Sequence, residues 1–374
     1  MIDSPINYIV LMSLILIFSS IFITKNKFIK LQINNANNDI DTLDGLRAVL
    51  ALGVFFHHTI IMYYYLDTSV WTLPTSKFYT LLGHISVILF FMITGFLFWR
   101  KILNNPNLDV IKLFKSRIKR IVPLYIFSVL LVFLVIAFLS KFTMHVPFNE
   151  LIIQLLKWFT FNSFGHPNIN NIKDTYIIEG VYWTLYYEWS FYFLLPVLAF
   201  LLRKSKYLVV LLMLIFYFYA EHVFIYFMYG MIAAQMINSN KNHPIFSSNY
   251  FRIFATISFI AIFFLSNIGY TKWPGFFSFI FFISILYGNS IFGLLKLKAT
   301  KALGLMSYSI YLLHNIILFI IFTSFNKYVL PINNLSDFQL FLLILFTLIS
   351  VVFISKITYQ HIEHKFYFQK RKAV

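Results

Sequence analysis

Eleven apolar runs, each long enough or nearly long enough to cross a hydrocarbon core, divide this chain of 374 residues. A soluble domain could not bury so much apolar surface, because 60% of the residues are hydrophobic and only 11% are charged. In lipid the backbone must satisfy its own hydrogen bonds, which favours helices. We therefore predict an all-α fold, a polytopic membrane helix bundle of about 10–11 transmembrane helices. The runs lie at 6–24, 47–66, 78–99, 121–140, 181–202, 207–220, 222–237, 251–268, 275–293, 303–324 and 339–357.

The distribution of basic residues predicts the orientation. With 207–220 and 222–237 counted as separate spans, 24 of the 30 lysines and arginines fall on one side of the membrane. The positive-inside rule places that side in the cytoplasm. We thus expect a multi-pass protein of the cell inner (cytoplasmic) membrane, with its N-terminus outside and its C-terminus in the cytoplasm. The net charge of +17 is then explained by the membrane topology, so we expect no nucleic acid partner.

Three ionisable side chains fall deep within predicted spans. His58 ends the stretch "LDGLRAVLALGVFFHH", eleven residues after Arg47, or about 16 Å along a helix. Similar counting places Glu188 and His314 near the middle of the bilayer, on two other helices. Such residues normally face the protein interior and have a partner. A carboxylate beside an imidazole orients a base, so we predict that Glu188 pairs with His58. The neighbouring His57 is an alternative base, since the helix rotation is unknown, and a simple hydrogen bond across helices is the other interpretation of each histidine.

Basic residues also gather where the fourth span begins. Arg117 and Arg120 lie three residues apart and therefore share a helix face, as a phosphate clamp requires. An ordinary positive-inside loop is the alternative interpretation. We expect no metal site, because the pair His361 and His364 lacks a third ligand and the chain has no cysteine. The segment 150–161 is amphipathic and too short to span, and it is expected to lie along the outer interface or to cover a cavity.

Five motifs follow one another along the chain: "LDGLRAVLALGVFFHH", "FFMITGFLFWR", the arginine pair ahead of Pro123 and Tyr125, "YWTLYYEWSFYFLLP" and "SYSIYLLH". In this order they resemble acyltransferase family 3, multi-span proteins that O-acylate extracytoplasmic sugars and related hydroxyls. The resemblance spans residues 43 to about 363, nearly the whole chain.

The resemblance implies specific roles for residues of this chain. The essential histidine of the family corresponds to His58, its paired arginines to Arg117 and Arg120, and its tryptophan-to-glutamate motif to Trp183 and Glu188. It also implies no permanently bound cofactor. The donor substrate is cytoplasmic acyl-CoA, in the first instance acetyl-CoA, and the acceptor is a hydroxyl of a surface polysaccharide or other extracytoplasmic glycan. Glycan-synthesis proteins are expected partners, besides the lipid bilayer.

This chain departs from the family pattern in two respects. Met62 stands where some relatives carry an acid one turn after the histidine, and Glu363 lacks the proline of a closing Glu-x-Pro. We divide the chain into an extra N-terminal transmembrane helix with a cytoplasmic connector (1–42), an acyltransferase transmembrane domain (43–363) and a basic cytoplasmic tail (364–374).

These residues lead to a mechanism and to two competing functions. Acyl-CoA would place its phosphates on Arg117, Arg120 and Arg47, and His314 would contribute to the substrate site. His58 would act as a general base on the acceptor hydroxyl or would briefly carry the acyl group. A transporter or flippase for a lipid-linked sugar would use the same polar groups to line a path, although matched broken helices in two related halves are not evident. An inactive scaffold for other membrane enzymes is the second alternative.

Overall fold

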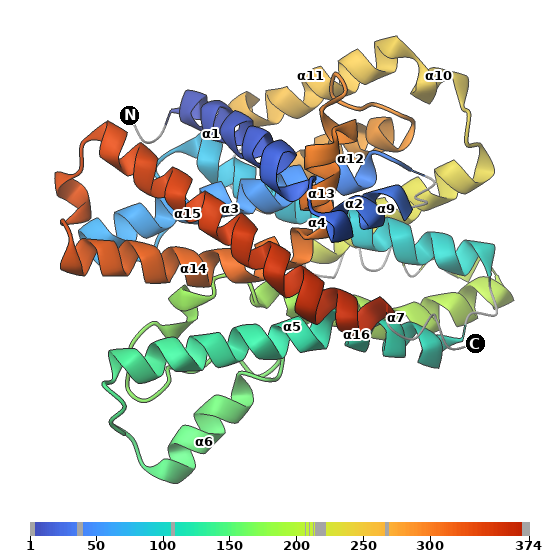
Figure 1. Ribbon diagram of the computed structural model, residues 1–374. Helices are drawn as coiled ribbons and strands as arrows, with labels where there is room; N and C mark the ends of the chain where they lie inside the picture. Colours follow the sequence, from blue (N-terminus) through green and yellow to red (C-terminus); the bar gives the residue numbers. More distant parts are fainter. Residues whose placement is uncertain are drawn as a thin grey trace.

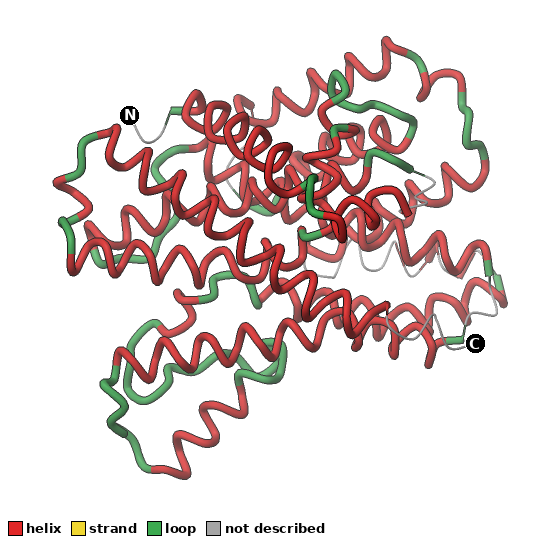
Figure 2. Tube along the Cα trace, viewed as in Figure 1, coloured by secondary structure: helices red, strands yellow, loops and turns green. Residues whose placement is uncertain are grey.

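The computed structural model describes residues 4–35, 40–105, 109–205, 207–208, 210–211, 213, 222–265 and 269–368. In this part of the chain the secondary structure is helical and contains no β-strand (Figures 1 and 2). The helices are α1 (Pro5–Phe18), α2 (Lys27–Asn35), α3 (Leu43–Thr68), α4 (Lys77–Asn104), α5 (Val110–Leu139), α6 (Phe148–Lys157), α7 (Trp183–Lys204), α9 (His222–Ser239), α10 (Pro244–Ser247), α11 (Asn249–Leu265), α12 (Lys272–Leu286), α13 (Lys298–Leu305), α14 (Ser307–Tyr328), α15 (Asp337–Thr358) and α16 (His364–Phe368).

The lengths of these helices confirm the all-α, polytopic bundle. Within the described residues, seven helical segments are long and apolar enough to cross a membrane: Pro5–Ile23, Leu43–Thr68, Lys77–Asn104, Ile111–Leu139, Trp183–Lys204, Ser307–Tyr328 and Asp337–Phe366. Three shorter apolar helices correspond to α9, α11 and α12. The run at 207–220 lies mostly outside the described residues, as does most of the tail at 364–374, so the count of eleven spans and the orientation stay predictions. The run expected at 275–293 is helical only to Leu286, because the backbone turns at Gly288, where φ is +97°.

Helices α3 and α4 form the centre of the bundle. Inside their most apolar windows, 89% and 83% of the residues are buried by protein, against 28% for α1, which leaves most of α1 to face lipid. Helix α4 packs closely along α9 because glycines face the contact. A Cβ atom on Gly95 would lie 2.2 Å from the carbonyl oxygen of Phe227, and one on Gly230 would lie 2.1 Å from that of Met92. Side chains from α3 and α4 are therefore held in a rigid interior.

Residues 140–182 form the α5–α7 connection, which carries α6 away from the bundle and then returns (Figure 1). Helix α6 has no buried side chain and exposes Phe148, Ile153 and Leu156. The return is fixed at Trp158, which is fully buried. The Tyr125 hydroxyl donates to the Trp158 carbonyl at 2.6 Å, and the Trp158 indole N–H donates to the Pro167 carbonyl at 2.9 Å. The amphipathic segment expected at 150–161 is thus a helix as far as Lys157 and a turn beyond it.

Candidate active site

A cavity of about 440 Å³ lies between α3, α4, α7, α14 and the α5–α7 connection, and we call it the histidine cavity. Its walls combine imidazole groups with large aromatic rings. Burial raises the pKa of Tyr270, in the loop before α12, well above its usual value, so this phenol stays neutral. The cavity is lined by Val54, His57, His58, Ile61, Trp71, Leu73, Gly83, His84, Val87, Asn162, His166, Tyr176, Glu179, Gly180, Val181, Trp183, Tyr270 and Tyr311.

His58 is held by a histidine from another helix. The Nδ1 atom of His58 lies 2.9 Å from Nε2 of His314 on α14. The Nδ1 atom of His314 lies 2.7 Å from the carbonyl oxygen of Tyr311, which only accepts, so the hydrogen of His314 is on Nδ1. In a neutral His314 ring Nε2 then accepts from His58 Nδ1–H. The network therefore leaves Nε2 of His58 with an unshared electron pair, which is the form that a general base requires.

His57 on α3 and His84 on α4, which also line the cavity, have different surroundings. His57 Nδ1 lies 3.0 Å from the Tyr79 carbonyl oxygen, so it donates there. His84 packs its ring against Tyr270, with 4.5 Å between centroids, and its Nδ1 is buried without a hydrogen-bond partner. Among the residues that the structure describes, no group of three or more histidine, aspartate or glutamate side chains could hold a metal ion. Both His57 and His58 line the cavity, because it extends around that side of α3.

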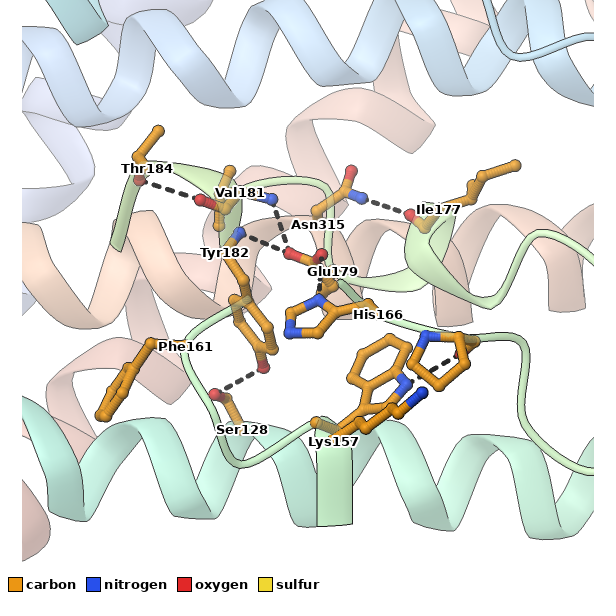
Figure 3. A network of polar contacts seen from close by, with 12 residues as sticks. Ser128, Lys157, Phe161, His166, Ile177, Glu179, Val181, Tyr182, Thr184 and Asn315 are labelled. Carbon is orange, nitrogen blue, oxygen red and sulfur yellow. Dashed lines mark hydrogen bonds and ion pairs between the residues drawn. The ribbon is translucent and has the colours of Figure 1, made fainter. Parts of the chain in front are cut away.

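Gly180 brings the α5–α7 connection close to the histidine pair. Its φ is +66°, a conformation that glycine adopts without strain. A Cβ atom at this position would lie 2.7 Å from Nδ2 of Asn315 and 3.3 Å from Nε2 of His58. Asn315 in turn donates from Nδ2 to the Ile177 carbonyl at 2.6 Å (Figure 3). The connection therefore contacts α14 immediately beside His314.

Glu179 fixes the end of the same connection. Its Oε2 accepts from the backbone N–H groups of Val181 and Tyr182 at 2.7 and 2.6 Å, where a carboxylate also favours the start of α7. Its Oε1 lies 3.3 Å from Nδ1 of His166, whose ring stacks on Trp158 with 4.4 Å between centroids (Figure 3). This pair was not predicted from the sequence. An acid just ahead of a helix is a recognisable signal for Glu179, whereas no sequence pattern indicates His166.

A second cavity, of about 100 Å³, collects the predicted arginines, and we call it the arginine cavity. Arg47 comes from α3, and Arg117 and Arg120 come from α5. The Arg117 guanidinium is buried and lies 5.0 Å from the centroid of the Phe98 ring. Arg47 lies 3.9 Å from the Asp44 carboxylate within α3. Residues far apart in the sequence thus produce one concentrated positive site.

Glu188 belongs to the arginine cavity, which corrects the prediction that it pairs with His58. Its carboxylate accepts a hydrogen bond from the Tyr192 hydroxyl, one turn further along α7. The depth counted from the sequence leaves the rotation of the helix open, and α7 turns Glu188 toward α4 and α5. The partner of His58 is His314. A catalytic role for Glu188 stays a prediction. Trp183, at the start of α7, does line the histidine cavity.

The fold and the two cavities define a helical membrane protein with one cavity lined by histidines and another lined by arginines. The family to which it belongs follows from comparison with known proteins. The family model of the acyltransferase domain of acyltransferase family 3 matches residues 40–357, so the chain belongs to that family and is an acyltransferase. No curated protein and no solved structure matches the chain.

Proposed function

We propose that the chain is an integral membrane O-acyltransferase that moves an acyl group, acetyl in the first instance, from cytoplasmic acyl-CoA to a hydroxyl of an extracytoplasmic glycan. The observation that carries the proposal is the hydrogen-bonded His58–His314 pair, which presents a basic nitrogen inside a cavity. In the predicted topology the arginine cavity faces the cytoplasm and the histidine cavity faces outward. Glycan-synthesis proteins of the inner membrane are the partners that we propose.

The arginine cavity supports acyl-CoA as the donor. Guanidinium groups form charge-assisted hydrogen bonds with phosphate, so Arg47, Arg117 and Arg120 would hold the phosphates of the donor. Glu188 shares this cavity and offsets part of the positive charge when the donor is absent. The thioester would extend from this cavity toward the histidine cavity.

The reaction needs one proton transfer and one acyl transfer. Nε2 of His58 takes the proton from the acceptor hydroxyl as its oxygen attacks the thioester carbonyl carbon. The carbon–sulfur bond then breaks, and the coenzyme A thiolate leaves and receives that proton from His58. His314 acts as a positioning residue, since it fixes the tautomer of His58 and accepts a hydrogen bond that strengthens while the ring carries charge.

The proposal is tested with the purified full-length chain in lipid nanodiscs. Acetyl-CoA is the donor, and surface polysaccharide stripped of its esters by mild alkali is the acceptor. His58→Ala should lower the transfer rate by about 10²–10⁴-fold, the range for a general base. His57→Ala is the matched control and should cost much less, because it removes the neighbouring imidazole and leaves the His58–His314 hydrogen bond in place. Equal activity of wild type and His58→Ala would refute the proposal.

Two further measurements separate the alternatives. A stoichiometric burst of thiol release without acceptor would indicate that His58 carries the acyl group instead of acting only as a base. Mass analysis of surface glycans from a deletion strain distinguishes an acyltransferase from a transporter. Loss of an acyltransferase removes only the ester, and the sugar is still exported. Sugar retained inside the cell would point to a flippase.

A further inference from the structure

The histidine cavity and the arginine cavity share two lining residues, and we call this pair the wall between them. Among the described residues, Val87 of α4 and Tyr311 of α14 are the ones that line both the histidine cavity and the arginine cavity. His58 lies on one side of this wall and the three arginines on the other. An acyl group held by a donor in the arginine cavity must therefore pass Val87 and Tyr311 to reach the acceptor near His58.

Tyr311 is held in the wall by a directed hydrogen bond. Its hydroxyl lies 2.9 Å from Oγ1 of Thr184 on α7. Thr184 donates its single hydroxyl hydrogen to the Val181 carbonyl, also at 2.9 Å, so Tyr311 is the donor in the pair. The Tyr311 ring packs edge-on against Phe90, with 5.5 Å between centroids.

The backbone carbonyl of Tyr311 positions the proposed base, His58, through His314. The carbonyl oxygen of Tyr311 accepts from Nδ1 of His314, which in turn orients His58. The side chain of Tyr311 can therefore turn about its own χ angles while the carbonyl keeps the histidine pair in place. Val87, the other residue of the wall, is buried and branched at Cβ, so it has little rotamer freedom.

We propose that Val87 and Tyr311 form the acyl passage of the enzyme: Val87 sets the length of the acyl group that can be transferred, and Tyr311 keeps water from the thioester until an acceptor binds. The inference rests on the proposed function and adds to it a specificity-determining pair. A continuous wet path would let water attack the thioester in place of the acceptor hydroxyl, with release of carboxylate and free thiol. It would also breach the permeability barrier of the membrane.

The first experiment measures acyl-length preference in the nanodisc assay, with acetyl-, propionyl- and butyryl-CoA. Val87→Ala removes two methyl groups from the wall and should raise the ratio of butyryl to acetyl kcat/KM by about 10-fold or more, since a methylene in an apolar pocket changes discrimination by about 10–200-fold. Val54→Ala is the matched control, because Val54 is an equally buried valine that lines only the histidine cavity. It should leave the ratio within about 2-fold of wild type, well below that range.

The second experiment measures thiol release from acetyl-CoA without acceptor. Tyr311→Phe keeps the ring and loses the hydrogen bond to Thr184, and Thr184→Val removes the same bond from the other side. Each should raise acceptor-independent thiol release several-fold above wild type. Both variants keep the His314–Tyr311 contact, which uses backbone oxygen.

The outcomes distinguish this inference from the proposed function. A wild-type chain that transfers no acyl group, or does so without His58, overturns both. An active, His58-dependent wild type overturns the acyl passage alone if Val87→Ala matches Val54→Ala in acyl preference. The role of Tyr311 is overturned if neither Tyr311→Phe nor Thr184→Val increases thiol release.

Discussion

Replacement of Gly180 by alanine should damage both stability and catalysis, and the structure separates the two effects. The first cost is backbone strain, because φ is +66° and a left-handed conformation costs an L-residue about 1–2 kcal/mol. The second is steric, since the new Cβ would lie 2.7 Å from Nδ2 of Asn315. Displacing that amide breaks its hydrogen bond to the buried Ile177 carbonyl, which costs a further ~1–3 kcal/mol.

The matched control is Gly165→Ala, in the same α5–α7 connection. Gly165 has a φ of +71°, yet an added Cβ there meets nothing within 4 Å. It therefore carries only the strain of about 1–2 kcal/mol. In detergent, the unfolding temperature should be highest for wild type, lower for Gly165→Ala and lowest for Gly180→Ala.

Catalysis distinguishes the two variants more sharply. The alanine methyl at position 180 crowds Nε2 of His58 at 3.3 Å, whereas Gly165 does not line the histidine cavity and an added Cβ there meets nothing within 4 Å. Gly180→Ala should lower kcat by about 10-fold or more, because small displacements of a catalytic group are costly, while Gly165→Ala retains near wild-type kcat below its unfolding temperature. The reasoning is refuted if the two variants match in both kcat and unfolding temperature.

Three further predictions concern the two cavities and the α5–α7 connection. His314→Ala should lower kcat by about 10²-fold or more with little change in the KM for acetyl-CoA, because it frees the tautomer of His58 and leaves the arginines in place; a change confined to KM would contradict this. Arg117→Ala should raise the KM for acetyl-CoA by about 10-fold, the effect of one hydrogen bond to a charged group, whereas the exposed Lys112→Ala should not; equal KM values for the two would exclude the clamp. Tyr182→Phe removes the 2.6 Å hydrogen bond to Ser128 and should lower unfolding stability by about 1 kcal/mol without changing kcat, and an unchanged unfolding temperature would contradict the anchoring role.

The membrane helices could be predicted from the sequence because their formation depends mainly on the length and hydropathy of a continuous run of residues. A run of apolar residues must become a membrane helix wherever it is long enough, and α3, α4 and α14 formed where hydropathy placed them. The arginine pair was predictable for a similar reason, since a spacing of three places Arg117 and Arg120 on one face whatever the surroundings.

The partner of His58 was not predictable in this way. Counting residues gives the depth of a side chain, and by depth Glu188 and His314 were equivalent candidates. The choice between them depends on which helices touch and on their rotation. Those follow from packing contacts such as Gly95 against α9, which no single-sequence pattern specifies. The contact of Gly180 with Asn315 could not be predicted from the sequence for the same reason.

One turn of α14 connects the features that the proposed reaction needs. Tyr311 contributes its ring to the wall between the cavities and its carbonyl to His314. His314 orients the base, and Asn315 holds the connection that carries Gly180. Because these residues lie within one turn of a rigid helix, a shift of α14 would move the wall, the base and the contact between Asn315 and Gly180 together. A change that displaces the backbone of this turn should therefore alter water exclusion and base orientation jointly, whereas Arg117→Ala in α5 should alter donor affinity alone.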